Sequence, residues 1–143
     1  MDTMPIEPSK ACELFRGGLN CAQAVFCAFA PKYGVEERLA SKVSCALGGG
    51  VGRMREVCGA VTGAGLVIGL KYGEDKIVVY PHMQEFCSRF KEKCGSIVCR
   101  ELLAGTAATS GGAPEARTPE YYAKRPCADI VKLAAEILCE MGL

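Results

Sequence analysis

The chain has 143 residues, of which 50% are hydrophobic and 23% charged, and its formal net charge is +1. This length and balance predict one globular domain over residues 1–143 with a core of its own. Such a small net charge gives no bulk attraction to nucleic acid or to an anionic membrane, so we expect neither as a partner.

We also expect neither a signal peptide nor a membrane-spanning helix. The first residues show no positively charged leader followed by an apolar core, as a signal peptide would. The longest nearly uncharged apolar run, 57–70, is too short and too rich in glycine to span a bilayer. We therefore expect a cytoplasmic protein.

The first part of the chain reads as amphipathic helices joined by short loops. A short helix is expected over 9–16. A second is expected to start at Asn20, with Gln23 three residues later as in a capping box. A third, over 36–46, is expected to bury three apolar residues, Leu39, Val43 and Leu47.

The central element is expected to be a helix over 58–72, which follows a loop containing three consecutive glycines. The helix itself holds Gly59, Gly63, Gly65 and Gly69. Each glycine costs a helix about 1 kcal/mol relative to alanine, so four of them indicate that another group approaches the backbone closely. That group could be a neighbouring helix or a cofactor. The positions that we assign to cofactor approach are Gly49, Gly50, Gly59 and Gly63.

The rest of the chain continues as helices. One is expected over 75–93, kinked or restarted at Pro81, and a short one over 97–103. The segment 106–119 is rich in Gly, Ser, Thr, Ala and Pro, which predicts a mobile surface loop. A final helix is expected to start near Pro126. The predicted fold is an all-α, single-domain bundle of about six helices around the small-residue-rich central helix.

Ten cysteines are many for a chain of this length. In a reducing cytoplasm such cysteines more often bind metal or carry redox chemistry than form structural disulfides. No C-x-x-C pair occurs in the sequence, which argues against zinc knuckles, the bacterial ferredoxin pattern and the thioredoxin motif. Any site must therefore be assembled by the fold from distant segments.

Four cysteines share one kind of position, the first turn of a predicted helix on its apolar face. They are Cys21, Cys58, Cys99 and Cys127. The partial positive charge and unpaired N–H groups of a helix start stabilise a thiolate, so we expect these thiols to be acidic. They could converge if the helix starts meet at one end of the bundle. Cysteine is also a small buried hydrophobe, so packing alone is the competing interpretation.

Other candidate groups are less specific. Cys87, Cys94 and Cys139 lie in the middle or toward the end of predicted helices and are expected to fill the core. Arg53 and Arg55, after the glycine loop, could hold an anion, although the loop lacks a complete phosphate-binding or dinucleotide-binding motif.

Several segments together resemble the family of redox-active proteins named for a C…GCAxxG…C…C pattern. They are Asn-Cys-Ala-Gln at 20–23, GGGVGRMREVCGAVTGAGLVIGLKYG at 48–73, FKEKCGSIVCREL at 90–102, and the late Cys127. One departure is that glycine follows Cys58 here, whereas the family label places it before its second cysteine. The resemblance implies that Cys21, Cys58, Cys99 and Cys127 are the functional set. It also implies a redox role and an iron–sulfur cluster, because split-Soret cytochromes carry a similar domain. Haem is not expected, since no C-x-x-C-H attachment motif is present.

Three function classes remain open at this point. The first is an electron-transfer protein whose four helix-start thiolates bind an iron–sulfur cluster or another soft metal. The second is a metal-free thiol–disulfide oxidoreductase that uses two of the same cysteines. The third is a non-catalytic helical domain in which the cysteines only pack. Both redox classes require a redox partner that the sequence does not identify, and the chain could form a homodimer.

Overall fold

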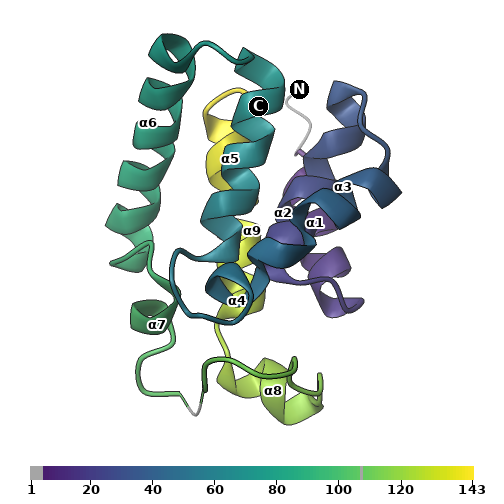
Figure 1. The fold of residues 1–143 in the computed structure, drawn as a ribbon, viewed down its shortest axis with the longest axis vertical. Helices are drawn as coiled ribbons and strands as arrows, with labels where there is room; N and C mark the ends of the chain where they lie inside the picture. Colours follow the sequence, from purple (N-terminus) through teal and green to yellow (C-terminus); the bar gives the residue numbers. More distant parts are fainter. Residues whose placement is uncertain (1–4, 107) are drawn as a thin grey trace.

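The computed structural model describes residues 5–106 and 108–143, and in these ranges the chain forms a helical bundle (Figure 1). The α-helices in chain order are α1 (Glu7–Arg16), α2 (Cys21–Phe29), α3 (Glu37–Ser44), α4 (Gly48–Val51), α5 (Gly59–Tyr72), α6 (Lys76–Cys94), α7 (Cys99–Leu102), α8 (Pro119–Lys124) and α9 (Cys127–Glu140). Short 3-10 turns cover Ala30–Tyr33 and Cys45–Leu47. Within the described ranges the only strand-like feature is one antiparallel bridge, between Val57 and Val98. The predicted all-α class is confirmed.

The helix α5 lies at the centre, with α2, α6 and α9 packed against it, while α1 packs against α2 and α9 (Figure 1). Its apolar side chains Val61, Ala64 and Ile68 are almost fully buried. On another side it crosses α2 at short range. A Cβ added to Gly63 would lie 2.7 Å from the backbone oxygen of Ala22. At this position the glycine serves close packing of two helix backbones.

The helix α2 begins as the sequence predicts. The backbone N–H of Gln23 donates to the side chain of Asn20, and the backbone N–H of Asn20 donates to the side chain of Gln23, both at 2.9 Å. The Asn20 amide also donates to the carbonyl of Cys45 at 2.9 Å. The capping box therefore fixes the first turn of α2 and ties it to the segment that precedes the glycine loop.

The sequence predicted the wrong buried face for α3. Leu39 and Val43 are 49% and 53% exposed, whereas Ala40 and Ser44 are fully buried. The side chain of Gln23 donates to the backbone and hydroxyl of Ser41, which turns the small-residue face of α3 toward α2. Small residues permit this close approach, and tertiary hydrogen bonds thereby override the apolar periodicity.

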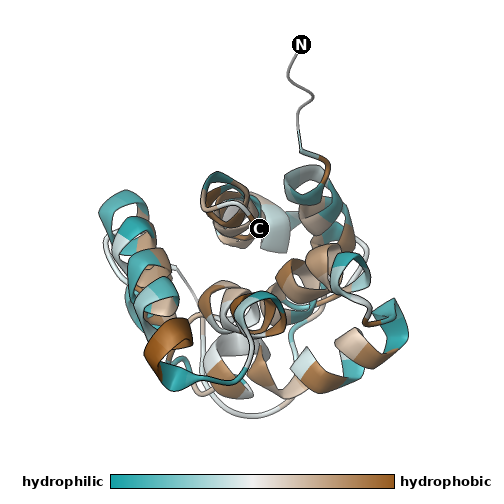
Figure 2. Ribbon diagram, turned by 90° about the horizontal axis from the view of Figure 1, so that it is seen from above, coloured by the Kyte–Doolittle hydropathy of each residue, from teal (hydrophilic) through white to brown (hydrophobic). Residues whose placement is uncertain are grey.

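The helix α6 runs through Pro81 without ending there. Asp75 caps its start by accepting the N–H of Ile77 at 3.0 Å. Phe86 and Phe90 face the core and are fully buried. Figure 2 shows hydrophilic residues along the outer side of α6, with exposed apolar residues, Ile77 among them, near its start.

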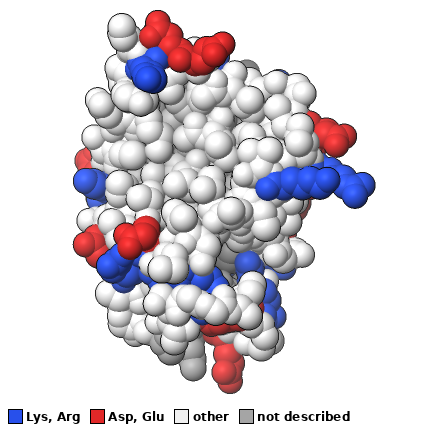
Figure 3. Space-filling model, viewed as in Figure 1, with Lys and Arg blue, Asp and Glu red and all other residues white. Residues whose placement is uncertain are grey.

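Three short helices, α4, α7 and α8, lie together at the end of the bundle where α5 and α9 begin (Figure 1). Lys and Arg side chains gather toward this end, while much of the face above it is uncharged (Figure 3). The predicted loop 106–119 precedes α8, and its residues 108–118 form neither helix nor strand; Ala107 lies outside the described residues. Among the described helices, none is both long enough and apolar enough to cross a membrane.

Candidate functional site

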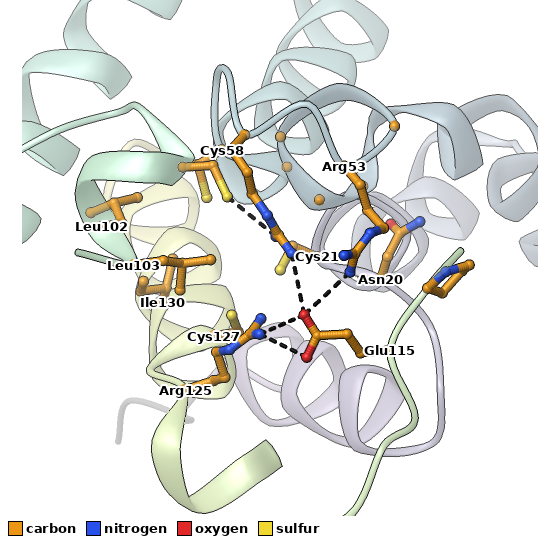
Figure 4. Close-up of a pocket in the computed structure, with 18 of the residues that line it drawn as sticks. Asn20, Cys21, Arg53, Cys58, Leu102, Leu103, Glu115, Arg125, Cys127 and Ile130 are labelled. Carbon is orange, nitrogen blue, oxygen red and sulfur yellow. Dashed lines mark hydrogen bonds and ion pairs between the residues drawn. The ribbon is translucent and has the colours of Figure 1, made fainter. Parts of the chain in front are cut away.

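A cavity of about 280 Å³ opens at this end of the bundle (Figure 4). All four of the cysteines singled out from the sequence line it, and they come from four different parts of the chain. Cys21, Cys99 and Cys127 are the first residues of α2, α7 and α9, and Cys58 directly precedes α5. The predicted convergence of helix starts is therefore observed.

Cys58 and Cys99 are brought to the cavity by the short backbone bridge. The N–H of Cys58 donates to the carbonyl of Ile97 at 2.7 Å, and the N–H of Cys99 donates to the carbonyl of Glu56 at 2.6 Å. In an antiparallel pair, residues one step beyond the bridged pair in each direction lie diagonally on one face. The bridge between Val57 and Val98 thus presents both thiols to the same side.

The glycine loop forms the wall of the cavity beside Cys99. Gly49 and Gly50 have left-handed backbone, with φ of 67° and 71°. A Cβ on Gly50 would lie 2.7 Å from Cys99 Cβ and 2.8 Å from Arg55 Cα, so glycine is required there on two counts. Val51, Arg53 and Arg55 also have left-handed backbone conformations, which residues other than glycine rarely adopt. Strained backbone of this kind is typical of functional sites.

The strained loop directs Arg53 and Arg55 into the cavity, where they meet Glu115 from the segment 108–118 (Figure 4). Arg53 lies 3.3 Å and Arg55 3.7 Å from the Glu115 Oε1 atom. Arg125, just before α9, donates to both carboxylate oxygens at 2.7 and 2.8 Å. The hydrogen bonds from Arg125, and next those from Arg53, hold the pKa of Glu115 below its ordinary value.

Arg55 also contacts the sulfur of Cys99, and Arg55 and Arg117 contact the chain around the cavity. Arg55 is 9% exposed, and its Nη1 lies 3.7 Å from Cys99 Sγ while its Nε donates to the carbonyl of Thr109 at 2.9 Å. Arg117 donates to the carbonyls of Phe15 and Leu19, both at 3.0 Å. The described residues that line the cavity thus include four arginines and one carboxylate. The cavity is strongly electropositive.

Cys21 and Cys127 behave as a pair. A hydrogen bond from Cys21 is the largest cause that lowers the pKa of Cys127 from 9.0 to about 7, and Arg125, Arg55 and Arg117 lower it further against the effect of burial. The same hydrogen bond, together with burial, raises the pKa of Cys21 well above its ordinary value. Within this pair, Cys127 is therefore the thiol whose ionisation is favoured.

A helix-start position alone does not lower the pKa of Cys58 or Cys21. Burial raises the pKa of Cys58 to about 12, although hydrogen bonds from the backbone of Ala60 and Val61 oppose the shift. The expectation that every thiol of the set is acidic is wrong for Cys58 and Cys21, because desolvation and the neighbouring thiols outweigh the helix terminus. Cys87, Cys94 and Cys139, whose pKa values burial also raises, do not line the cavity.

The four glycines assigned to cofactor approach separate into two groups. Gly49, Gly50 and Gly59 line the cavity. Gly63 does not; it lies one turn further along α5, against Ala22 of α2.

Soft metal binding has partial support from this arrangement. The chemistry of the donors fits, since four thiols from separate helix starts face one electropositive cavity. Their spacing fits less well. Within residues 5–106 and 108–143, no group of three or more His, Cys, Asp or Glu side chains stands close enough to hold a metal ion.

Sequence reasoning missed three residues of the cavity, Glu115, Arg117 and Arg125. They belong to no motif that the sequence displays and lie in or after a segment expected to be a surface loop. One signal was available: Glu115 is the single acidic residue of the segment 106–118. A lone carboxylate in a stretch of mostly small residues is a natural partner for arginines elsewhere.

The family model described as "Putative redox-active protein (C_GCAxxG_C_C)" matches residues 19–141. Comparisons with curated proteins and with solved structures gave no significant match. The match covers Cys21, Cys58, Cys99 and Cys127 and the helices that begin at or directly after them. The chain belongs to this family of redox-active proteins.

Proposed function

We propose that this member of the redox-active protein family carries out thiol–disulfide exchange through Cys127 and Cys21. The observation that carries the proposal is the pairing of these two thiols at the starts of α2 and α9, inside a cavity lined by four arginines. A thiolate is the nucleophile in exchange, and nearby cations make it available at neutral pH.

In the proposed reaction the Cys127 thiolate attacks one sulfur of a substrate disulfide. The substrate S–S bond breaks, a mixed disulfide forms on Cys127, and the leaving thiolate takes up a proton. The Cys21 thiol then loses its proton and attacks the Cys127 sulfur, which releases the second substrate thiolate. The protein gains one disulfide, and the substrate gains two electrons and two protons. A cellular reductant of the thiol class must reduce the Cys21–Cys127 disulfide for a further turnover.

A second candidate is favoured by the donor set itself. Cys21, Cys58, Cys99 and Cys127 could together hold an iron–sulfur cluster or another thiolate-bound metal, which would require their side chains to rotate toward one another. The arginines would offset the negative charge of four thiolates, and the backbone N–H groups beside Cys58 would donate to its sulfur. When bound, a cluster supplies one-electron transfer. Either function fits a cytoplasmic protein that works with a separate redox partner.

Cysteine variants distinguish thiol–disulfide exchange from cluster binding. The purified chain should reduce 2-hydroxyethyl disulfide and, after oxidation, yield a Cys21–Cys127 linked peptide in mass spectrometry. Cys127→Ser should abolish the reaction, and Cys21→Ser should accumulate the mixed disulfide on Cys127. Cys87→Ser, away from the cavity, is the matched control and should react as the wild type does.

Anaerobic preparation with iron and acid-labile sulfide analysis tests the cluster. Bound iron that is lost equally in Cys21→Ser, Cys58→Ser, Cys99→Ser and Cys127→Ser would favour the second candidate. Equal exchange rates in Cys127→Ser and the wild type would refute the first.

A further inference from the structure

The three arginines that meet at the cavity are bound to a carboxylate supplied by the chain itself. The Nη2 atom of Arg125 donates to both carboxylate oxygens of Glu115, at 2.7 and 2.8 Å, and Arg53 Nη1 lies 3.3 Å from the Oε1 atom. Charge-assisted hydrogen bonds from guanidinium groups to carboxylate oxygens are stronger than neutral ones, and here three guanidinium groups converge on one carboxylate. The group is thus complementary in charge to a carboxylate.

One glutamate does not balance these charges. The side chains of Arg53, Arg55 and Arg125 are only 14%, 11% and 7% exposed, while that of Glu115 is 33% exposed. Cations so far removed from water require nearby negative charge. Two positive charges of the group remain without a carboxylate, and one of these arginines, Arg55, also contacts Cys99. The excess lies directly beside the thiols.

The part of the segment before Glu115 is held by hydrogen bonds from two of the same arginines, whereas Arg117 ties the part after it to Phe15 and Leu19. Arg53 Nε donates to the carbonyl of Gly111 at 3.0 Å, and Arg55 Nε to that of Thr109 at 2.9 Å. The segment 108–118 has no helix or strand and is largely exposed. Displacing its carboxylate would therefore leave the packed core of the bundle intact, and an arriving carboxylate would restore the contacts that Glu115 gives up.

We propose that Arg53, Arg55 and Arg125 form the binding site for the carboxylate of a small disulfide substrate, and that Glu115 occupies this site until the substrate displaces it. The proposal rests on the function proposed above and specifies its substrate class, a low-molecular-weight disulfide made of two acidic thiols. The carboxylate binds the arginines, and the disulfide lies beside Cys127 and Cys21. Attack by Cys127 releases one acidic thiol and attack by Cys21 releases the other, so that the substrate gains two electrons and two protons in all.

Binding can be measured apart from redox chemistry. Glutarate carries two carboxylates and no sulfur, and its affinity can be followed by calorimetry in a Cys127→Ser background. Removal of the internal competitor in Glu115→Gln should tighten glutarate binding at least about tenfold, since a charge-assisted contact is worth that much. Glu85→Gln is the matched control, because Glu85 pairs with Arg89 on α6 and does not line the cavity. Addition of Arg53→Gln to Glu115→Gln should abolish the gain. Equal glutarate affinity in Glu115→Gln and Glu85→Gln would overturn the site.

Rates of thiol–disulfide exchange can also be measured on the unmodified chain, so this test does not depend on whether a variant folds. The probes are 3,3′-dithiodipropionate, 2-hydroxyethyl disulfide and cystamine, which are respectively anionic, neutral and cationic. The anionic disulfide should react fastest, and 0.5 M salt should reduce its advantage, as expected for charge recognition. Equal rates for the three, with no glutarate binding, would refute the carboxylate site and leave the exchange function standing. No reaction with any of them, together with tight glutarate binding to Glu115→Gln, would refute the exchange function alone.

Discussion

Replacing Gly63 with alanine tests whether the crossing of α2 and α5 positions the thiol pair. The new Cβ would lie 2.7 Å from the Ala22 backbone oxygen and 3.1 Å from Ala22 Cα. Both neighbours are backbone atoms, so no side-chain rotation can relieve the contact and one helix must move. Ala22 follows Cys21 in α2, and such a movement would therefore reach the cavity.

The expected change in the free energy of unfolding is the sum of two opposing contributions. Overpacking of a core contact costs about 1–3 kcal/mol. Alanine in place of glycine inside a helix returns about 1 kcal/mol through propensity. We expect Gly63→Ala to be destabilised by up to about 2 kcal/mol. Gly69→Ala is the matched control in the same helix, because a Cβ there would meet no atom within 4 Å. It should be stabilised by about 1 kcal/mol.

Urea denaturation of the two variants at equal protein concentration measures both effects. The midpoints should shift in opposite directions from the wild type, with unchanged slopes. Displacement of Cys21 should also weaken its hydrogen bond to Cys127, so the pH midpoint of Cys127 alkylation should rise in Gly63→Ala but not in Gly69→Ala. Equal stabilisation of both variants would refute the close crossing as the reason for Gly63.

Two further predictions concern the cavity. In the reduced wild type, Cys127 should be alkylated by iodoacetamide with a midpoint near pH 7, because its pKa is lowered to about 7 and its thiolate is lost as the pH falls below that value. Arg125→Gln should move the midpoint upward, as peptide mass spectrometry after timed quenching would show, and an unmoved midpoint would contradict the assigned role of Arg125. In thermal unfolding, Gly50→Ala should destabilise the chain more than Gly112→Ala. Both residues have left-handed backbone, but only a Cβ at Gly50 meets Cys99 and Arg55. Equal losses of stability would show that backbone strain alone accounts for the effect.

The local structure of the chain follows largely from its sequence. The capping box at Asn20 and Gln23 depends on contacts within a few residues, and the sequence also predicts the central helix and the helix starts at the four cysteines. Apolar periodicity and end signals contain that information. The same signals misassigned the buried face of α3, since its orientation is decided by hydrogen bonds from Gln23, far away in the chain.

The chemistry of the cavity depends on the tertiary structure. The sequence identifies four helix-start cysteines, but only the folded chain pairs Cys21 with Cys127 and places Arg125 and Glu115 beside them. A thiol pKa is set by burial and by charges within a few ångströms, which segments distant in sequence supply. Cys58 and Cys127 therefore share the same local signal and differ in acidity, because burial dominates at Cys58, whereas at Cys127 a hydrogen bond and three guanidinium groups outweigh it.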